Sequence, residues 1–175
     1  MSGHNKWSQI KHKKEKTDGV KSKVYSKYSK LISAEAQKTK GDKNSPSLRA
    51  LIERARAEDV TNDVIERAIK KAAEPGAALE TIVYEAYGPG GCAMIIEALT
   101  TNKNKAAQEV KHILVNNGFS LATPGSASWA FAREGITWKP TSTMDLADAD
   151  LTALERLVEA LEESEEVQEI FTNVE

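Results

Sequence analysis

Residues 81–100 read TIVYEAYGPGGCAMIIEALT, and this segment separates a helical part of the chain from a part built on strands. Before it, apolar residues recur every three or four positions, whereas within it and after it they recur with a period of about two. A period of two is typical of strands, and Gly-Pro-Gly-Gly is a strong turn sequence. We therefore expect two strands, over residues 81–87 and 92–100, joined by a turn at residues 88–91.

The sequence before this hairpin predicts three helices. Apolar residues mark one helical face from Val20 to about Lys38. Ser45-Pro46 predicts the start of a second helix and Thr61 the start of a third, since hydroxyl side chains cap helix N-termini and proline suits the first helical position. Pro75-Gly76 ends the third helix.

The sequence after the hairpin predicts two helices and three strands. They are a helix capped by Thr101 or Asn102 and ending at Asn117-Gly118, a hairpin over 127–132 and 136–139, a helix with residues 151–161 and a strand over 167–174. Trp129, Phe131 and Trp138 are the aromatic residues that we expect in the core. The order β-β-α-β-β-α-β favours an α+β fold, with two helices on one face of a mostly antiparallel sheet.

These elements predict a basic flexible arm over residues 1–19, a helical domain over 20–77 and an α/β domain over 78–175. The chain is 40% hydrophobic and 29% charged, which is ordinary globular composition, and no apolar run approaches the roughly 18 residues that cross a bilayer. The N-terminus lacks a signal-peptide pattern, and the single cysteine, Cys92, excludes an internal disulfide. We expect a cytoplasmic protein without a membrane partner.

The net charge of −2 conceals a strong segregation of charge along the chain. Residues 1–45 hold twelve lysines and four carboxylates, a net charge of +8, whereas residues 141–175 hold one arginine and eleven carboxylates, a net charge of −10. Within this end, an acidic run either mimics nucleic acid or shields the free arm, or it is a solvated helix end, which is the more common role of a charge run. The run consists of Glu162, Glu163, Glu165 and Glu166.

The basic residues near the N-terminus predict a nucleic-acid contact. The candidate residues are Lys6, Trp7, Lys11, His12, Lys13, Lys14, Lys16, Lys21, Lys23 and Lys27. Lysines that neutralise phosphates release counterions and bind polyanions with a steep salt dependence. Trp7 either stacks on an unpaired base or packs on the helical unit.

Residues 1–45 contain no arginine, the side chain that reads guanine edges with two parallel hydrogen bonds. We therefore expect recognition of backbone and shape, on double-stranded DNA or on folded RNA such as that of the ribosome.

Two further segments have alternative interpretations. Residues 88–91 either cradle a phosphate or form a hairpin turn, and the turn is favoured because the segment precedes a strand and lacks the lysine of a P-loop. Asn102, Lys103, Asn104 and Lys105 either make secondary phosphate contacts or simply begin a helix.

The sequence offers little support for catalysis. His4, His12 and His112 lack the spacing of a metal site, and Cys92 lies in an apolar strand, where a small buried hydrophobe is the more common role. We expect no enzyme activity, no cofactor, no metal and no small-molecule substrate.

The residues assembled above resemble the YebC family. Residues 3–14 fit its opening pattern Gly-His-x-Lys-Trp-x-x-Ile-Lys-His-x-Lys, and later blocks match in the same order, at residues 61–70, 84–91, 97–99, 102–105 and 125–131. Ala86 stands where a glycine is common in the family.

The resemblance implies a helical N-terminal domain followed by α/β domains. It also implies a regulator of gene expression, and mitochondrial relatives activate translation of a cytochrome oxidase subunit. Our leading expectation is a ribosome-associated factor that assists translation of proline-rich stretches, and the alternative is a DNA-binding transcription regulator. The usual family chain has a third, ferredoxin-like domain, which we expect to be absent here between about residues 139 and 147.

Overall fold

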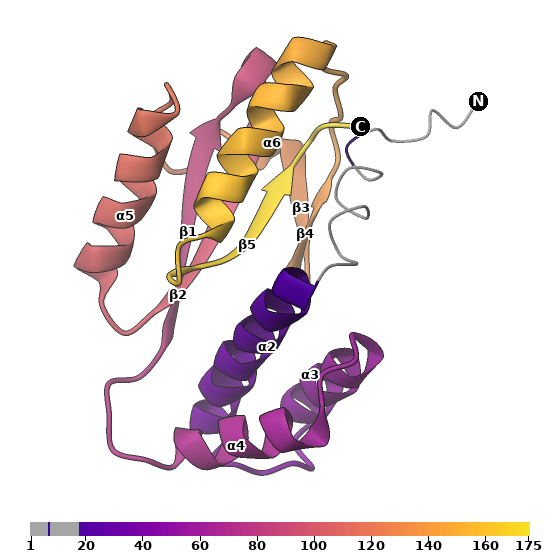
Figure 1. The fold of residues 1–175 in the computed structure, drawn as a ribbon, viewed down its shortest axis with the longest axis vertical. Helices are drawn as coiled ribbons and strands as arrows, with labels where there is room; N and C mark the ends of the chain where they lie inside the picture. The colour runs from indigo at the N-terminus through magenta and orange to yellow at the C-terminus, as the bar shows by residue number, and fades with distance from the viewer. Residues whose placement is uncertain (1–6, 8–17) are drawn as a thin grey trace. The chain divides into compact units, whose positions relative to one another are not determined.

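The computed structural model describes Trp7 and residues 18–175, with side chains described at Trp7 and from Lys21 onward. The chain divides into two compact units. The helical unit ends at Glu80, and the α/β unit comprises residues 81–175 together with Trp7 (Figure 1).

The helical unit contains the three predicted helices. They are α2 (Asp18–Thr39), α3 (Pro46–Ala57) and α4 (Asn62–Ala72). Both predicted caps are confirmed, because the Ser45 hydroxyl accepts the Leu48 N–H at 3.3 Å and the Thr61 hydroxyl accepts the Val64 N–H at 3.4 Å. Each cap satisfies a backbone donor that the first helical turn leaves without a partner.

Side chains from all three helices form the core of the helical unit. Ile32 of α2, Leu48 of α3 and Ile65 of α4 are almost completely buried. Burying each of them contributes about 1.5–3 kcal/mol. The buried Ser33 hydroxyl donates to the Ala68 carbonyl at 2.9 Å, so a satisfied polar contact also joins α2 to α4.

The α/β unit has the predicted element order. Its strands and helices are β1 (Glu80–Tyr87), β2 (Ala93–Thr100), α5 (Lys103–Asn116), β3 (Phe131–Glu134), β4 (Thr137–Pro140), α6 (Asp148–Glu162) and β5 (Val167–Thr172), with short 3-10 turns η1 (Pro89–Gly91) and η2 (Ser128–Ala130). β1, β2 and β5 form one sheet with β2 in the centre, and β3 and β4 form a separate antiparallel pair. The α+β class is confirmed, and the strands form two sheets.

The central strand β2 is buried on both faces. Met94 and Ile96 belong to a cluster with residues of α5 and α6, while Ala93 and Ile95 belong to a cluster with Phe131 at the start of β3. The two helices therefore cover one face of the three-stranded sheet, as expected, and Figure 1 shows them side by side over it. The β3–β4 hairpin and η2 lie against the other face.

One core prediction is wrong. Phe131 is buried and Trp138 is partly buried, but the side chain of Trp129 is 60% exposed. The first strand of the hairpin begins at Phe131, because the preceding residues form the turn η2. In that turn Ala127 and Ala130, which are completely buried, pack toward the sheet, and the indole between them points outward.

A buried carboxylate of β1 organises the loop before η2. Glu85 accepts hydrogen bonds from the backbone N–H groups of Gly125, Ala127 and Ser128, at 2.5, 3.0 and 2.6 Å. Burial by itself would raise the pKa of Glu85, but these N–H donors outweigh it, and the pKa lies below its ordinary value of 4.5. The ionised carboxylate is therefore the form that the fold stabilises.

The glycine-rich segment between β1 and β2 is a tight turn, which is the favoured sequence interpretation. The Gly88 N–H donates to the Cys92 carbonyl at 2.8 Å. Gly90 has a φ of +67°, and a Cβ added there would lie 2.5 Å from Cδ2 of Leu146 and 3.1 Å from Oδ2 of Asp150. The turn packs against the segment that begins α6, so a side chain at Gly90 would have to displace the end of the Leu146 side chain.

Gly90→Ala should lower the free energy of unfolding by about 2–4 kcal/mol, since it combines left-handed strain with overpacking against Leu146. Gly91 is a matched control, because its φ is +80° but nothing lies within 4 Å of an added Cβ. Gly91→Ala should cost only the strain, about 1–2 kcal/mol. Urea unfolding measures both variants, and equal losses would show that close packing at Gly90 is unimportant.

Glu85→Gln should destabilise the protein at neutral pH by about 2 kcal/mol, because the amide loses charge-assisted hydrogen bonds. Since the folded pKa lies below the unfolded value of 4.5, the wild-type advantage should be complete above pH 4.5 and disappear as pH falls through the folded pKa. Thermal unfolding at several pH values measures the difference. Glu134 is exposed, so Glu134→Gln is the control. A difference in stability between wild type and Glu85→Gln that does not change with pH would contradict the stabilising role of the ionised Glu85 carboxylate.

Candidate nucleic-acid interface

The structure describes four of the ten residues predicted to bind nucleic acid through the N-terminal region. Lys6, Lys11, His12, Lys13, Lys14 and Lys16 lie outside the described residues. Lys21 and Lys23 are exposed near the start of α2, and Lys27 is half-buried one turn later. Their role in binding stays a prediction, and the exposure of Lys21 and Lys23 is compatible with it.

The two units carry opposite charge. Residues 21–80 contain thirteen lysines and arginines and nine carboxylates, whereas residues 81–175 contain six and fifteen. Several cations of the helical unit are paired on its surface, including Lys43 with Glu66 at 2.7 Å and Arg49 with Glu53 at 3.4 Å. The helical unit keeps a net positive charge, so it is the unit to which phosphates would be attracted.

Trp7 lies against the α/β unit. Its side chain is partly buried and packs against the hydrophobic cluster that α5, α6 and the sheet share. The alternative interpretation of Trp7 expected packing on the helical unit, and the structure places the indole elsewhere. Packing against this cluster leaves less of the indole surface available for stacking on a base.

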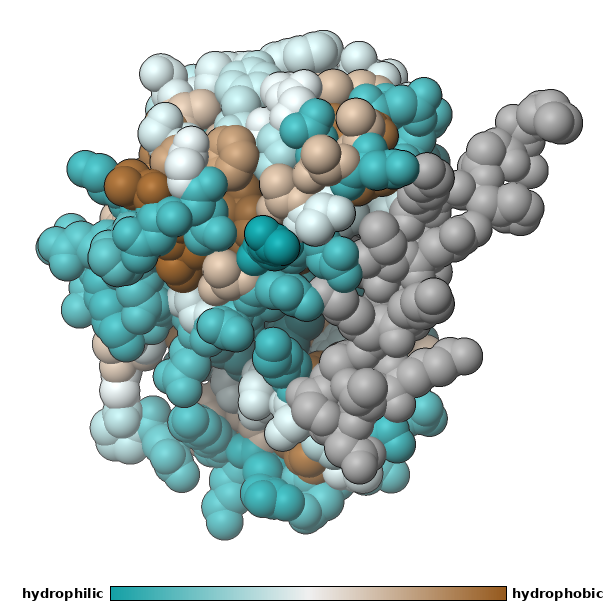
Figure 2. All heavy atoms as spheres, turned by 45° about the horizontal axis from the view of Figure 1, so that its top comes forward, coloured by the Kyte–Doolittle hydropathy of each residue, from teal (hydrophilic) through white to brown (hydrophobic). Residues whose placement is uncertain are grey.

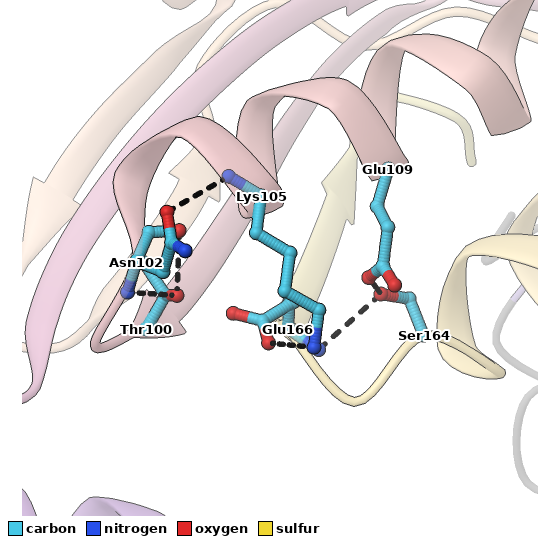
Figure 3. Close-up of polar contacts among 6 residues, drawn as sticks. All are labelled: Thr100, Asn102, Lys105, Glu109, Ser164 and Glu166. Carbon is cyan, nitrogen blue, oxygen red and sulfur yellow. Dashed lines mark hydrogen bonds and ion pairs between the residues drawn. The ribbon is translucent and has the colours of Figure 1, made fainter.

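The start of α5 shows how a second predicted phosphate site is built (Figure 3). The Asn102 side-chain oxygen accepts the Lys105 N–H at 3.1 Å, which caps the helix. The Thr100 hydroxyl accepts the Asn102 N–H at 2.9 Å and holds the capping residue in place. The capping role of Asn102 is therefore present in the structure.

Lys105 is paired with a carboxylate of its own chain. Its ammonium nitrogen lies 3.3 Å from Oε1 of Glu166, whose side chain is only 11% exposed (Figure 3). The hydrogen bond with Glu166 and its negative charge raise the pKa of Lys105. An incoming phosphate would meet this carboxylate, so phosphate binding by residues 102–105 stays a prediction that the geometry does not favour.

Sequence reasoning missed that three carboxylates, Glu85, Glu97 and Glu166, are buried, and it placed Glu166 in a solvated acidic run. Besides Glu85, Glu97 of β2 is buried, accepts the Trp138 indole N–H at 2.8 Å and lies 3.3 Å from an Arg133 nitrogen. The Arg133 guanidinium also stacks over the Trp138 ring, 5.1 Å from its centroid. A glutamate within an apolar strand indicates from sequence alone that a carboxylate could be buried. It does not indicate which residues donate hydrogen bonds to it.

Cys92 is a poor nucleophile in this environment. Its side chain is completely buried, and burial raises the pKa of the thiol to about 11, so the thiol stays protonated at neutral pH. Among residues 18–175 and Trp7, no group of three His, Cys, Asp or Glu side chains is arranged to hold a metal ion. No helix within the same part of the chain is long and apolar enough to cross a membrane.

Two family patterns cover nearly the whole sequence. The pattern described as the TACO1/YebC protein N-terminal domain matches residues 5–75. The pattern described as the TACO1/YebC second and third domain matches residues 79–137 and 133–174. The second match is in two pieces that overlap at residues 133–137, and the absence of a third domain between about residues 139 and 147 stays a prediction.

Two similar proteins have the same kind of name. A protein of Petrotoga mobilis is 43% identical over 98% of this chain and 70% of its own length, and one of Fervidobacterium nodosum is 34% identical over 99% of this chain and 93% of its own. Each is named probable transcriptional regulatory protein. Other relatives are also matched over about 70% of their length, so this chain is shorter than many of them.

A solved structure agrees with the fold. The crystal structure of a conserved hypothetical protein from Aquifex aeolicus superposes with a TM-score of 0.78, at 25% sequence identity, over 90% of this chain and 91% of that one. Fold, domain patterns and related sequences agree with the resemblance found in the N-terminal motif. The chain belongs to the TACO1/YebC family.

Proposed function

We propose that this protein is a non-enzymatic regulator of gene expression that binds nucleic acid through the lysines of residues 6–27. The observation that carries the proposal is the segregation of charge, with a basic N-terminal region and helical unit and an acidic α/β unit. Lys21 and Lys23, both exposed on α2, extend the predicted arm onto a folded helix. Phosphates attract such a surface without requiring a particular base sequence.

Regulation without catalysis is supported by the chemistry of the site and by the related proteins. The buried, protonated thiol of Cys92 offers no nucleophile at neutral pH. The relatives are named as regulatory proteins. The protein would then act by occupying a nucleic acid and changing which other factors bind there.

Double-stranded DNA is the first candidate target, because the relatives are named probable transcriptional regulatory proteins. Residues 1–45 contain no arginine, so the lysines would contact the phosphate backbone, and preference for a site would come from DNA shape.

Structured RNA on the ribosome is the second candidate. The resemblance to the YebC family implies a factor that assists translation of proline-rich stretches, and a lysine arm suits the backbone of folded RNA as well as that of DNA. Titration of the full chain with duplex DNA and with ribosomes, in parallel at physiological salt, separates the two targets. The tighter complex identifies the target, and binding to neither would overturn the proposal.

Changing Lys11, Lys13 and Lys14 together to alanine should flatten the salt dependence of binding. If all three contact phosphates, the slope of log K against log salt should fall by about three units. Fluorescence anisotropy over a range of salt concentrations measures the slope.

The matched control removes the same charge from exposed residues of the α/β unit, with Lys111, Lys139 and Arg156 changed to alanine. This variant should keep the wild-type slope. Equal slopes for the two triple variants would exclude the arm lysines from the contact.

A further inference from the structure

Two aromatic rings are exposed side by side on the α/β unit. The side chain of Trp129 is 60% exposed and that of Tyr87 is 39% exposed. The Trp129 indole N–H donates to the Tyr87 hydroxyl at 2.9 Å, and this hydroxyl donates to the Ser126 carbonyl. The face shown in Figure 2 has hydrophobic residues gathered in patches among hydrophilic ones.

The hydrogen bonds of this pair fix what it presents to solvent. The indole N–H and the phenol O–H are both used within the protein. The remaining exposed surface consists of ring faces and edges, which recognise other flat or apolar groups.

The backbone beneath the rings holds them in place before any ligand arrives. Glu85 and Tyr87 lie two residues apart on β1, and the Glu85 carboxylate fixes the loop that leads to Trp129 through the N–H groups of Ala127 and Ser128. Ala127 and Ala130, on either side of Trp129, are completely buried. A ring fixed in this way loses little conformational entropy on binding.

Trp129 contributes little to the core. The cluster on this face of the sheet consists of Ala93, Ile95, Ala127, Ala130 and Phe131, with Trp138 and Phe171 partly buried against it. A large aromatic residue that is held rigidly outside the core is more typical of a contact surface than of packing.

The sequence around the pair indicates the charge of its ligand. Residues 119–132 and 86–96 contain no charged side chain, in a chain that is 29% charged. The carboxylate of Glu85 is buried and hydrogen-bonded, so no exposed carboxylate from these segments would attract a cationic peptide. The ligand group that fits is neutral, flat and aromatic.

We propose that Tyr87 and Trp129 form a stacking platform for one unpaired base of a single-stranded nucleic acid. The proposal rests on the proposed function, because the lysines would supply the attraction to phosphate and the platform would supply a contact that a duplex, whose bases are already stacked, does not offer. Stacking of a base on an aromatic side chain contributes about 1–3 kcal/mol, or about 5- to 150-fold in affinity.

Trp129→Ala in the full chain tests the platform. The probes are a twelve-nucleotide oligouridine and a duplex DNA of the same length, each carrying a fluorescent label. Affinity for the single strand should fall by about 5- to 150-fold, while affinity for the duplex stays unchanged. Trp129→Phe, which keeps a ring but loses the hydrogen bond to Tyr87, should retain part of the single-strand affinity.

Val115→Ala is the matched control, because Val115 is 55% exposed on α5 and belongs to neither surface. It should bind both probes as the wild type does. Single-strand affinity that is unchanged in Trp129→Ala, or reduced equally for both probes, would overturn the platform.

The lysine variant separates this proposal from the proposed function. If the Lys11, Lys13 and Lys14 variant loses affinity for both probes while Trp129→Ala loses none, the platform is wrong and the lysine surface stands. If the wild type binds neither probe at low salt, the platform is wrong, and the titration with ribosomes decides the proposed function.

Discussion

Burial of β2 on both faces is the constraint on which the α/β unit depends. Its residues alternate between a cluster shared with α5 and α6 and a cluster shared with β3 and η2. Because the apolar side chains on each face must be shielded from water, two helices pack on one side and a hairpin with a turn packs on the other. The antiparallel pairing with β5, which places Ile95 opposite Phe171 and Ile96 opposite Ile170, extends both clusters to the end of the chain.

Because both faces of the sheet are covered, some polar side chains on it are removed from water. Two carboxylates on the sheet, Glu85 and Glu97, are buried and need hydrogen-bond donors within the protein. Backbone N–H groups supply them for Glu85. The Trp138 indole and the Arg133 guanidinium supply them for Glu97. The Glu85 contact rigidifies the loop that presents Trp129. The helical unit has a different role, because its exposed lysines and arginines outnumber its carboxylates. In the proposed account, the lysines attract phosphate and the exposed aromatic pair of the α/β unit is a separate contact surface.

Local features of the sequence were enough to predict the helices, their caps and the element order, since periodicity and capping depend on neighbouring residues. Trp129 was placed wrongly because residues 128–130 form the turn η2 and not part of the strand, so the alternation of buried and exposed residues does not extend back from Phe131 to Trp129. The partners of Glu85 lie about forty residues along the chain, and nothing in the local pattern of β1 reveals them. The position of Trp7 against α5, α6 and the sheet was equally inaccessible, because a single aromatic residue has no periodicity that selects a partner.

The central claim is that the basic N-terminal residues bind a phosphate-bearing polymer. Its most direct test compares the full chain with a chain shortened to residues 18–175, using duplex DNA and structured RNA at physiological salt, after circular dichroism has shown that both chains are folded. The account predicts that the shortened chain binds both polymers at least about tenfold more weakly, because five lysines are lost. Equal affinity of the two chains for both polymers would contradict it.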